Sequence, residues 1–165
     1  MAIILQSETS NVENANSYIS VEETISYFSI RGVDLTDFDG EDVEFACIKA
    51  TDYIDLVDDY KSSILDEDQE TQWPRKGYGI PVNIKKAAFE YAKIILVDGQ
   101  ELSPNLEYTD NGQNIKSEKV KIGPIEETIT YKDDYKNNVS RSYAKADGYL
   151  KRYRSTSSSS YLIGR

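Results

Sequence analysis

The sequence predicts a mainly α-helical protein: a small bundle of three to four helices with a β-hairpin insertion and extended N- and C-terminal arms. Apolar residues recur at helical spacing in three separate segments, and residues 115–131 partly alternate polar and apolar residues around a Gly-Pro turn. Residues 6–19 and the Ser-rich residues 155–160 are polar, and 165 residues suffice for one such domain. We therefore expect an N-terminal arm at 1–19, a helical domain at 20–154 and a flexible C-terminal tail at 155–165.

The first helix is predicted at about residues 21–31. Ser20 and Glu23 form the pattern of a capping box, in which the serine hydroxyl accepts from the Glu23 amide and the glutamate reaches back. Apolar residues follow at helical spacing, and Gly32 suits the position just past a helix end. These signals place both ends of the helix.

Two longer helices are predicted at about residues 41–57 and 82–97. The apolar stripe of the earlier one consists of Val43, Cys47, Ala50, Ile54 and Val57. The stripe of the later one consists of Ile84, Ala87, Ala88, Tyr91, Ile94 and Ile95. Between the two helices, residues 58–79 are predicted to form a loop, with a dense acidic run at 66–70.

The strand signal lies at residues 115–131, where two short segments flank Gly123-Pro124 and indicate a hairpin. A weaker helix is predicted at about residues 139–153, because Gly148 lowers its helical propensity. The last residues are a Ser-rich linker with a short apolar tip.

Composition excludes several classes of catalytic site. The chain has no histidine, so it cannot build a charge-relay triad or a histidine metal site. Its one cysteine, Cys47, lies on the apolar stripe of a predicted helix, which favours a buried structural thiol. Two acidic segments around a glycine, 35–46 and 107–118, depart from the EF-hand pattern. We expect no enzyme, no cofactor and no bound metal.

Charge is distributed unevenly along the chain. Residues 1–114 hold 8 Lys/Arg and 23 Asp/Glu, whereas residues 115–165 hold 11 and 6. One interpretation is a solvated acidic surface with a basic tail, and the other is association of identical copies, acid against base. The acidic body argues against a grip on DNA phosphates, because such contacts need Lys and Arg.

Trp73 is the only tryptophan, and it lies in the segment Gln-Trp-Pro-Arg-Lys-Gly at 72–77. It either anchors the loop to the helices or stacks single-stranded bases beside Arg75 and Lys76. We favour the structural anchor, with Pro74 fixing the turn and Arg75 facing an acidic group.

Five short motifs follow one another along residues 15–131. They are Asn-Ser-Tyr-Ile-Ser-Val-Glu-Glu at 16–23, Ala-Cys-Ile-Lys-Ala-Thr-Asp-Tyr at 46–53, Gln-Trp-Pro-Arg-Lys-Gly at 72–77, Ile-Pro with Ile-Lys-Lys-Ala at 80–87, and Ile-Lys-Ser-Glu-Lys-Val with Gly-Pro-Ile at 115–125. In this order they resemble a tailed-bacteriophage family often labelled DnaT-like, whose members are similar to head–tail adaptor, or head completion, proteins.

The resemblance implies a structural virion protein in the neck between capsid and tail, assembled in the host cytoplasm. It would form a dodecameric ring that binds the portal protein, extends the DNA channel and docks the tail or neck proteins. Genomic DNA would pass through without specific binding. The family label implies an alternative, a single-stranded-DNA-binding replication protein, and an orphan soluble regulator is a third possibility.

Two sets of residues are predicted to make contacts in the adaptor. Lysines of the hairpin would form the subunit interface by meeting an acidic neighbour: Lys116, Lys119 and Lys121. The portal-binding tail would consist of Lys151, Arg152, Arg154, Tyr161, Leu162, Ile163 and Arg165.

Overall fold

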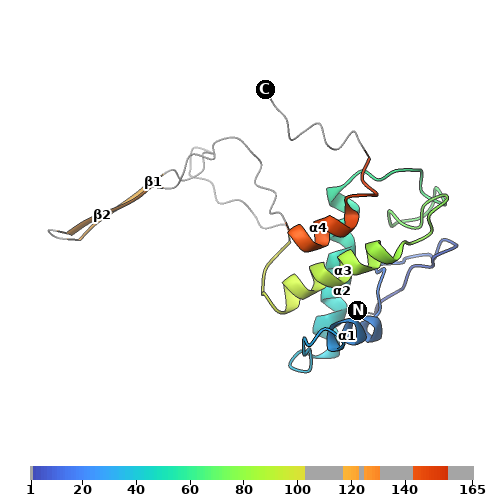
Figure 1. Cartoon of the computed structure of the whole chain (residues 1–165), viewed down its shortest axis with the longest axis horizontal. Coiled ribbons are helices and arrows are strands. Elements are labelled where there is room, and N and C mark those ends of the chain that lie inside the picture. Colours follow the sequence, from blue (N-terminus) through green and yellow to red (C-terminus); the bar gives the residue numbers. More distant parts are fainter. Residues whose placement is uncertain (1, 103–116, 123–124, 131–142, 156–165) are drawn as a thin grey trace. The chain divides into compact units, whose positions relative to one another are not determined.

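The computed structural model describes residues 2–102, 117–122, 125–130 and 143–155 (Figure 1). The chain divides into two compact units. One unit comprises Met1–Leu102 with Ser142–Arg165, and the other comprises Ser103–Arg141.

The first unit is mainly helical, which confirms the mainly α-helical part of the predicted fold class. Its helices are α1 (Val21–Ser29), α2 (Gly40–Val57), α3 (Val82–Leu96) and α4 (Ala144–Leu150). α3 packs against both α2 and α4, and α1 packs against α2 (Figure 1). No helix in the described part of the chain combines the length and the apolar character that a bilayer span requires.

The predicted capping box at the start of α1 is confirmed. The Glu23 amide donates to Ser20 Oγ over 3.1 Å, and the Ser20 amide donates to Glu23 Oε2 over 3.1 Å. α2 begins with a single side-chain cap, because Asp39 Oδ1 accepts from the Asp42 amide at 2.8 Å. These side chains satisfy amide groups that the first turn of a helix leaves without partners.

α4 is shorter than the helix predicted at 139–153, since it covers seven residues from Ala144 to Leu150. The chain turns after Lys151, and Gly148 near the end of the helix gives it little intrinsic support. Residues 139–142 of the predicted helix lie outside the described residues.

The segment expected as an N-terminal arm folds back and enters the core. The Gln6 amide donates to the Ser17 carbonyl over 2.9 Å, and the Gln6 side chain donates to Thr71 Oγ1, also over 2.9 Å. Tyr18 and Ile19 at its end are completely buried. The polar residues that indicated an arm therefore serve to pair its backbone, while the two apolar side chains supply buried area.

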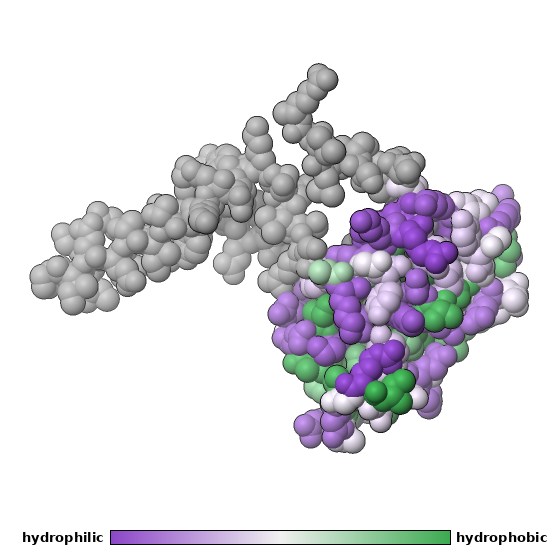
Figure 2. Space-filling view, in the orientation of Figure 1, coloured by the Kyte–Doolittle hydropathy of each residue, from purple (hydrophilic) through white to green (hydrophobic). Residues whose placement is uncertain are grey.

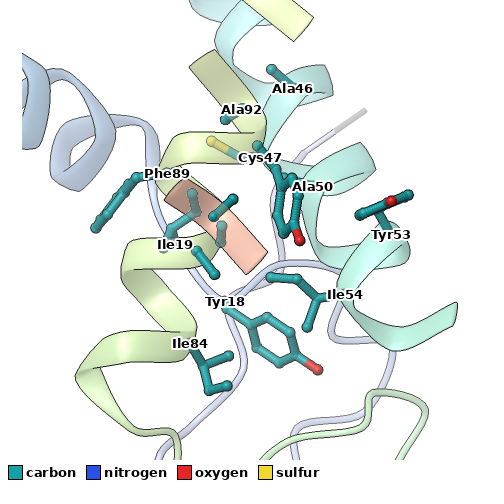
Figure 3. Close-up of a cluster of buried hydrophobic side chains, with 14 of the residues drawn as sticks. Tyr18, Ile19, Ala46, Cys47, Ala50, Tyr53, Ile54, Ile84, Phe89 and Ala92 are labelled. Carbon is teal, nitrogen blue, oxygen red and sulfur yellow. The ribbon is translucent and has the colours of Figure 1, made fainter. Parts of the chain in front are cut away.

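The core lies between α2, α3 and the end of the N-terminal segment (Figure 3). Tyr18 lies beside Ile54 of α2 and Ile84 of α3, and Cys47 points from α2 toward α3. Small residues such as Ala46, Ala50 and Ala92 let the helices approach closely (Figure 3). Each of the predicted apolar stripes of α2 and α3 contributes to this core. Figure 2 shows a largely hydrophilic outer face on which apolar side chains form separate small spots.

The second unit contains the strands β1 (Ser117–Ile122) and β2 (Ile125–Thr130), paired antiparallel from Ser117↔Thr130 to Ile122↔Ile125. Lys116 and the side chains of both strands lie outside the described residues. The hairpin as an insertion in the helical domain, and its lysines as subunit contacts, therefore stay predictions.

Candidate functional site

Trp73 lies at the centre of a group of four aromatic rings. Its side chain is completely buried, and the rings of Tyr60, Tyr78 and Tyr153 meet it edge-on at centroid distances of 5.3, 6.3 and 5.5 Å. We call these four rings the aromatic junction. Only Tyr78 reaches solvent to a large extent, with 46% of its surface exposed.

Backbone hydrogen bonds hold the residues after α4 against the loop between α2 and α3. The Lys61 amide donates to the Tyr153 carbonyl over 2.8 Å, and the Ser155 amide donates to the Asp59 carbonyl over 2.7 Å. Within the loop, the Lys76 amide donates to the Ser63 carbonyl over 3.0 Å. Segments more than 70 residues apart in the chain thus meet at the junction.

Arg75 fixes the loop from inside. Its guanidinium donates to the carbonyls of Tyr60, Lys61, Ser62 and Gln72, at 3.2 Å for Tyr60, 3.0 Å for Lys61 and 3.2 Å for Gln72. The sequence predicted an acidic partner for Arg75. The structure places backbone carbonyls there instead, because an irregular loop leaves many carbonyls without helix or sheet partners. The Trp73–Pro74 peptide bond in this loop is cis.

A second set of hydrogen bonds ties the loop to α2 through the N-terminal segment. The Trp73 amide donates to Tyr18 Oη over 3.0 Å, and Tyr18 Oη donates to Asp55 Oδ1. Burial raises the pKa of Asp55 to about 7, and the hydrogen bonds from Tyr18 and the Gln72 backbone only partly offset this effect.

Arg154, a residue of the predicted portal-binding tail, is occupied within the chain. Its Nε lies 2.7 Å from Asp58 Oδ2, and its guanidinium also donates to Asp147 Oδ1 over 3.1 Å. Lys151 and Arg152 are exposed. The remaining residues of that predicted set, Tyr161, Leu162, Ile163 and Arg165, lie outside the described residues.

Exposed cations lie at the aromatic junction or next to it in the sequence, and Tyr78 is the half-exposed ring of the junction. Lys61, Lys76 and Arg152 are all exposed, and the Arg152 guanidinium lies 4.9 Å from the centroid of the Tyr153 ring. The Lys61 amine donates to the Arg152 carbonyl over 2.8 Å. An accessible aromatic ring beside several cations is suited to stack a nucleobase and to contact phosphates.

The fold therefore brings together two sets of residues that lie far apart in the sequence. These are the Trp73–Arg75 anchor and the basic residues after α4. Sequence reasoning missed the three tyrosines of the junction. The chain has 13 tyrosines, and no local pattern distinguishes those that would meet Trp73. The only available signal was the Trp73 motif itself, in which Tyr78 follows Lys76 and Gly77.

Cys47 has an environment that fits a structural thiol. It is completely buried, Thr24 Oγ1 lies 3.2 Å from its sulfur, and burial raises the pKa of the thiol to about 11. Among the residues that the structure describes, no group of three or more Asp, Glu or Cys side chains is arranged to hold a metal ion.

Comparison with protein families gives a match to a family described as "Putative DnaT-like ssDNA binding protein", over residues 1–165. Neither the curated proteins nor the solved structures contain a match to the chain. The description of the matched family names single-stranded DNA binding. The interpretation as a head–tail adaptor is therefore wrong, and so are the portal, tail and ring partners that were predicted with it. Since the match extends over the whole sequence, the chain belongs to this DnaT-like family.

Proposed function

We propose that the protein binds single-stranded DNA without catalysing a reaction, and that the aromatic junction is its binding site. The observation that carries the proposal is the half-exposed ring of Tyr78, which packs on Tyr153, together with exposed Arg152, which lies over the same Tyr153 ring and contacts exposed Lys61. The family match over residues 1–165 supports the same ligand.

Tyr78 is well placed to stack a base. The rings of Trp73 and Tyr153 support it edge-on, at centroid distances of 6.3 and 6.1 Å, so little conformational freedom is lost when a base lands on it. Stacking of one base on an aromatic side chain contributes about 1–3 kcal/mol and tolerates every base.

The net charge of −10 does not oppose this proposal, because charge at the site differs from the mean. The mean charge of residues 1–114 is negative, whereas folding brings Lys61 against Arg152 from the basic C-terminal part, and Lys76 lies in the same loop as Lys61. Of the carboxylates beside this group, Asp58 is paired with Arg154, whereas Asp59 is exposed. We expect weak long-range attraction to DNA and a local contact with about three phosphates, which gives a salt slope of about −2.

Two further details of the fold, the hairpin and the C-terminal arm, are part of the same proposal. We propose that residues 115–131 form a hairpin inserted into the helical domain and that residues 155–165 extend from it as an arm. An isolated two-stranded hairpin is marginal in water, so we keep Lys116, Lys119 and Lys121 as predicted contacts with a neighbouring acidic surface.

Fluorescence anisotropy with a labelled oligothymidylate of about 20 nucleotides tests the function. Tyr78→Ala should weaken binding about 5- to 100-fold, which corresponds to the loss of one stacked base. Lys76→Glu should weaken binding and lower the salt slope, whereas Lys49→Glu, at an exposed position on α2, should change neither beyond the small effect of net charge.

The proposal fails if the unmodified protein shows no binding at low and physiological salt. The assignment of the site fails if binding occurs and both Tyr78→Ala and Lys76→Glu leave it unchanged. Far-UV circular dichroism and thermal unfolding of each variant show whether the fold is preserved.

A further inference from the structure

A second surface that combines cations with an aromatic ring lies on the outward side of α4. Lys145 and Tyr149 are four residues apart on this helix, so their side chains project from the same face. Lys86 of α3 joins them, with its amine 5.8 Å from the centroid of the Tyr149 ring. We call Lys86, Lys145 and Tyr149 the α4 surface.

The side chains of this surface are accessible in different degrees. Lys145 is 63% exposed, although its amine lies 2.6 Å from the buried carboxylate of Glu90. Lys86 and Tyr149 are half-buried, so each has one side in contact with the protein and the other open to solvent. A ring held in this way can stack a base on its open side with little loss of side-chain entropy.

The single carboxylate of α4 is turned toward the interior. Asp147 accepts hydrogen bonds from the Tyr91 hydroxyl at 2.7 Å, from the Tyr143 amide at 2.7 Å and from Arg154 at 3.1 Å. Its negative charge is therefore engaged on the inner side of the helix. Glu90 is likewise buried and is held by Lys145 and the Tyr27 hydroxyl. The outward side of α4 consequently presents cations and an aromatic ring.

The α4 surface continues from the aromatic junction along the chain. Arg152, whose guanidinium lies over the Tyr153 ring of the junction, follows Tyr149 by three residues in the turn that ends α4. A strand that leaves the junction past Arg152 and follows the chain back along α4 would meet Tyr149. The positive charge and the aromatic ring both fit a nucleic-acid strand, whereas an acidic peptide would use only the cations.

We propose that the α4 surface is a second base-stacking subsite for the same DNA strand, with Tyr149 stacking a base and Lys86 contacting a phosphate. This inference rests on the proposed function, because it presupposes a strand at the junction. It predicts a site that is longer than the junction alone and that short oligonucleotides cannot fill.

The test compares labelled oligothymidylates of about 4 and about 20 nucleotides, a range that covers site sizes of single-strand-binding folds. Tyr149→Ala should weaken binding of the longer strand about 5-fold or more and leave the shorter strand unaffected. Tyr149→Phe should bind the longer strand as the unmodified protein does, because a phenylalanine ring still stacks. Lys86→Glu should also weaken binding of the longer strand at low salt. Lys49→Glu is the matched charge control.

The outcomes separate this inference from the proposed function. If Tyr78→Ala weakens binding while Tyr149→Ala and Lys86→Glu do not, the DNA strand stops at the junction and the subsite is wrong. If Tyr149→Phe is as defective as Tyr149→Ala, stacking is not the role of this residue. A poly-glutamate peptide can compete with the strand for Lys86 and Lys145. If the peptide binds Tyr149→Ala with the same affinity as the unmodified protein and still displaces the strand, the surface recognises negative charge only. Absence of any DNA binding by the unmodified protein overturns both proposals together.

Discussion

The backbone amide of Trp73 donates a hydrogen bond to the phenolic oxygen of Tyr18 over 3.0 Å, and both side chains are completely buried. Tyr18 belongs to the N-terminal segment, and its hydroxyl in turn donates to Asp55 of α2. One hydroxyl thus joins three parts of the chain at the base of the aromatic junction. The loop that carries Tyr78 is held in place from a segment more than 50 residues earlier in the sequence.

Tyr18→Phe should therefore destabilise the protein by about 1–3 kcal/mol, because the variant leaves the buried Trp73 amide without its acceptor. Urea denaturation followed by tryptophan fluorescence measures this change, and the emission of Trp73 reports on the loop directly. Tyr78→Phe is the control, since its ring is half exposed and should lose less than about 0.5 kcal/mol. Equal stabilities of the two variants would show that the Tyr18 hydroxyl contributes nothing.

Asp55 should make stability depend on pH. Burial raises the pKa of its carboxyl to about 7 in the folded state, against about 3.9 in an unfolded chain. Between these values the folded state binds more protons than the unfolded state, so stability falls as pH rises from about 4 to 7. The loss should not exceed about 3 kcal/mol, because Asp55 keeps some contact with solvent.

Urea denaturation at several pH values between about 4.5 and 8 measures this dependence. Asp55→Asn should flatten the curve, because an amide at this position cannot titrate. Asp52 and Asp58, whose pKa values burial also raises, remain in the variant, so the quantity of interest is the difference between the two curves. Parallel curves would exclude Asp55 as the titrating group.

The positions of the helices could be predicted because their signals are local. The Ser20–Glu23 capping box and the apolar stripes around Cys47 and Ala88 each lie within a few turns of one helix, and the observed bounds differ from the predicted ones by at most two residues for α1, α2 and α3. The helix predicted near residue 150 was too long, because the apolar periodicity extends beyond the residues whose helical propensity supports a helix.

The candidate site could not be predicted to the same extent, because it depends on contacts between distant segments. Lys61 pairs with Tyr153, and Arg154 pairs with Asp58, at separations of more than 90 residues. The averaged negative charge of residues 1–114 also concealed a local group of cations. Only the tertiary fold shows that Lys61 contacts Arg152 and that Arg152 and Tyr78 both pack on Tyr153.

Cys47 should be unreactive toward thiol reagents in the folded protein. Its side chain is completely buried and burial raises the pKa of the thiol to about 11, so the reactive thiolate is scarce at neutral pH. A chromogenic disulfide reagent should react with one thiol per chain after denaturation in urea and with almost none before it. Rapid labelling of the native protein would mean that α2 and α3 open frequently at this point.

Trp73→Ala should cost about 3–5 kcal/mol, because it removes a large buried ring and leaves a cavity between Tyr60 and Tyr153. Thermal unfolding followed by circular dichroism measures the change, since the variant lacks tryptophan fluorescence. Trp73→Phe, which retains part of the ring volume, should recover a substantial share of the loss. A loss below about 1 kcal/mol for Trp73→Ala would contradict its role as an anchor of the loop.

Arg152 and Arg154 should have opposite roles, although they are two residues apart. Arg154 bridges Asp58 and Asp147, whose side chains are only 9% and 22% exposed. Arg154→Ala leaves both carboxylates without their cation and should destabilise the protein by about 2–4 kcal/mol, somewhat below the range for fully buried pairs because Arg154 is itself partly exposed. Arg152→Ala removes an exposed cation and should change stability by less than about 0.5 kcal/mol.

DNA binding should show the reverse order. Arg152→Ala should weaken binding to a labelled oligothymidylate and lower the magnitude of the salt slope by about 0.7, which is the contribution of one phosphate contact on a single strand. Arg154→Ala, measured at a temperature where the variant is still folded, should retain the slope of the unmodified protein, because its guanidinium is already occupied by two carboxylates. The paired measurement of unfolding free energy and salt slope for these two variants separates the residue that holds the C-terminal segment from the residue that meets the ligand. A lower salt slope in Arg154→Ala together with an unchanged slope in Arg152→Ala would exchange the two assignments.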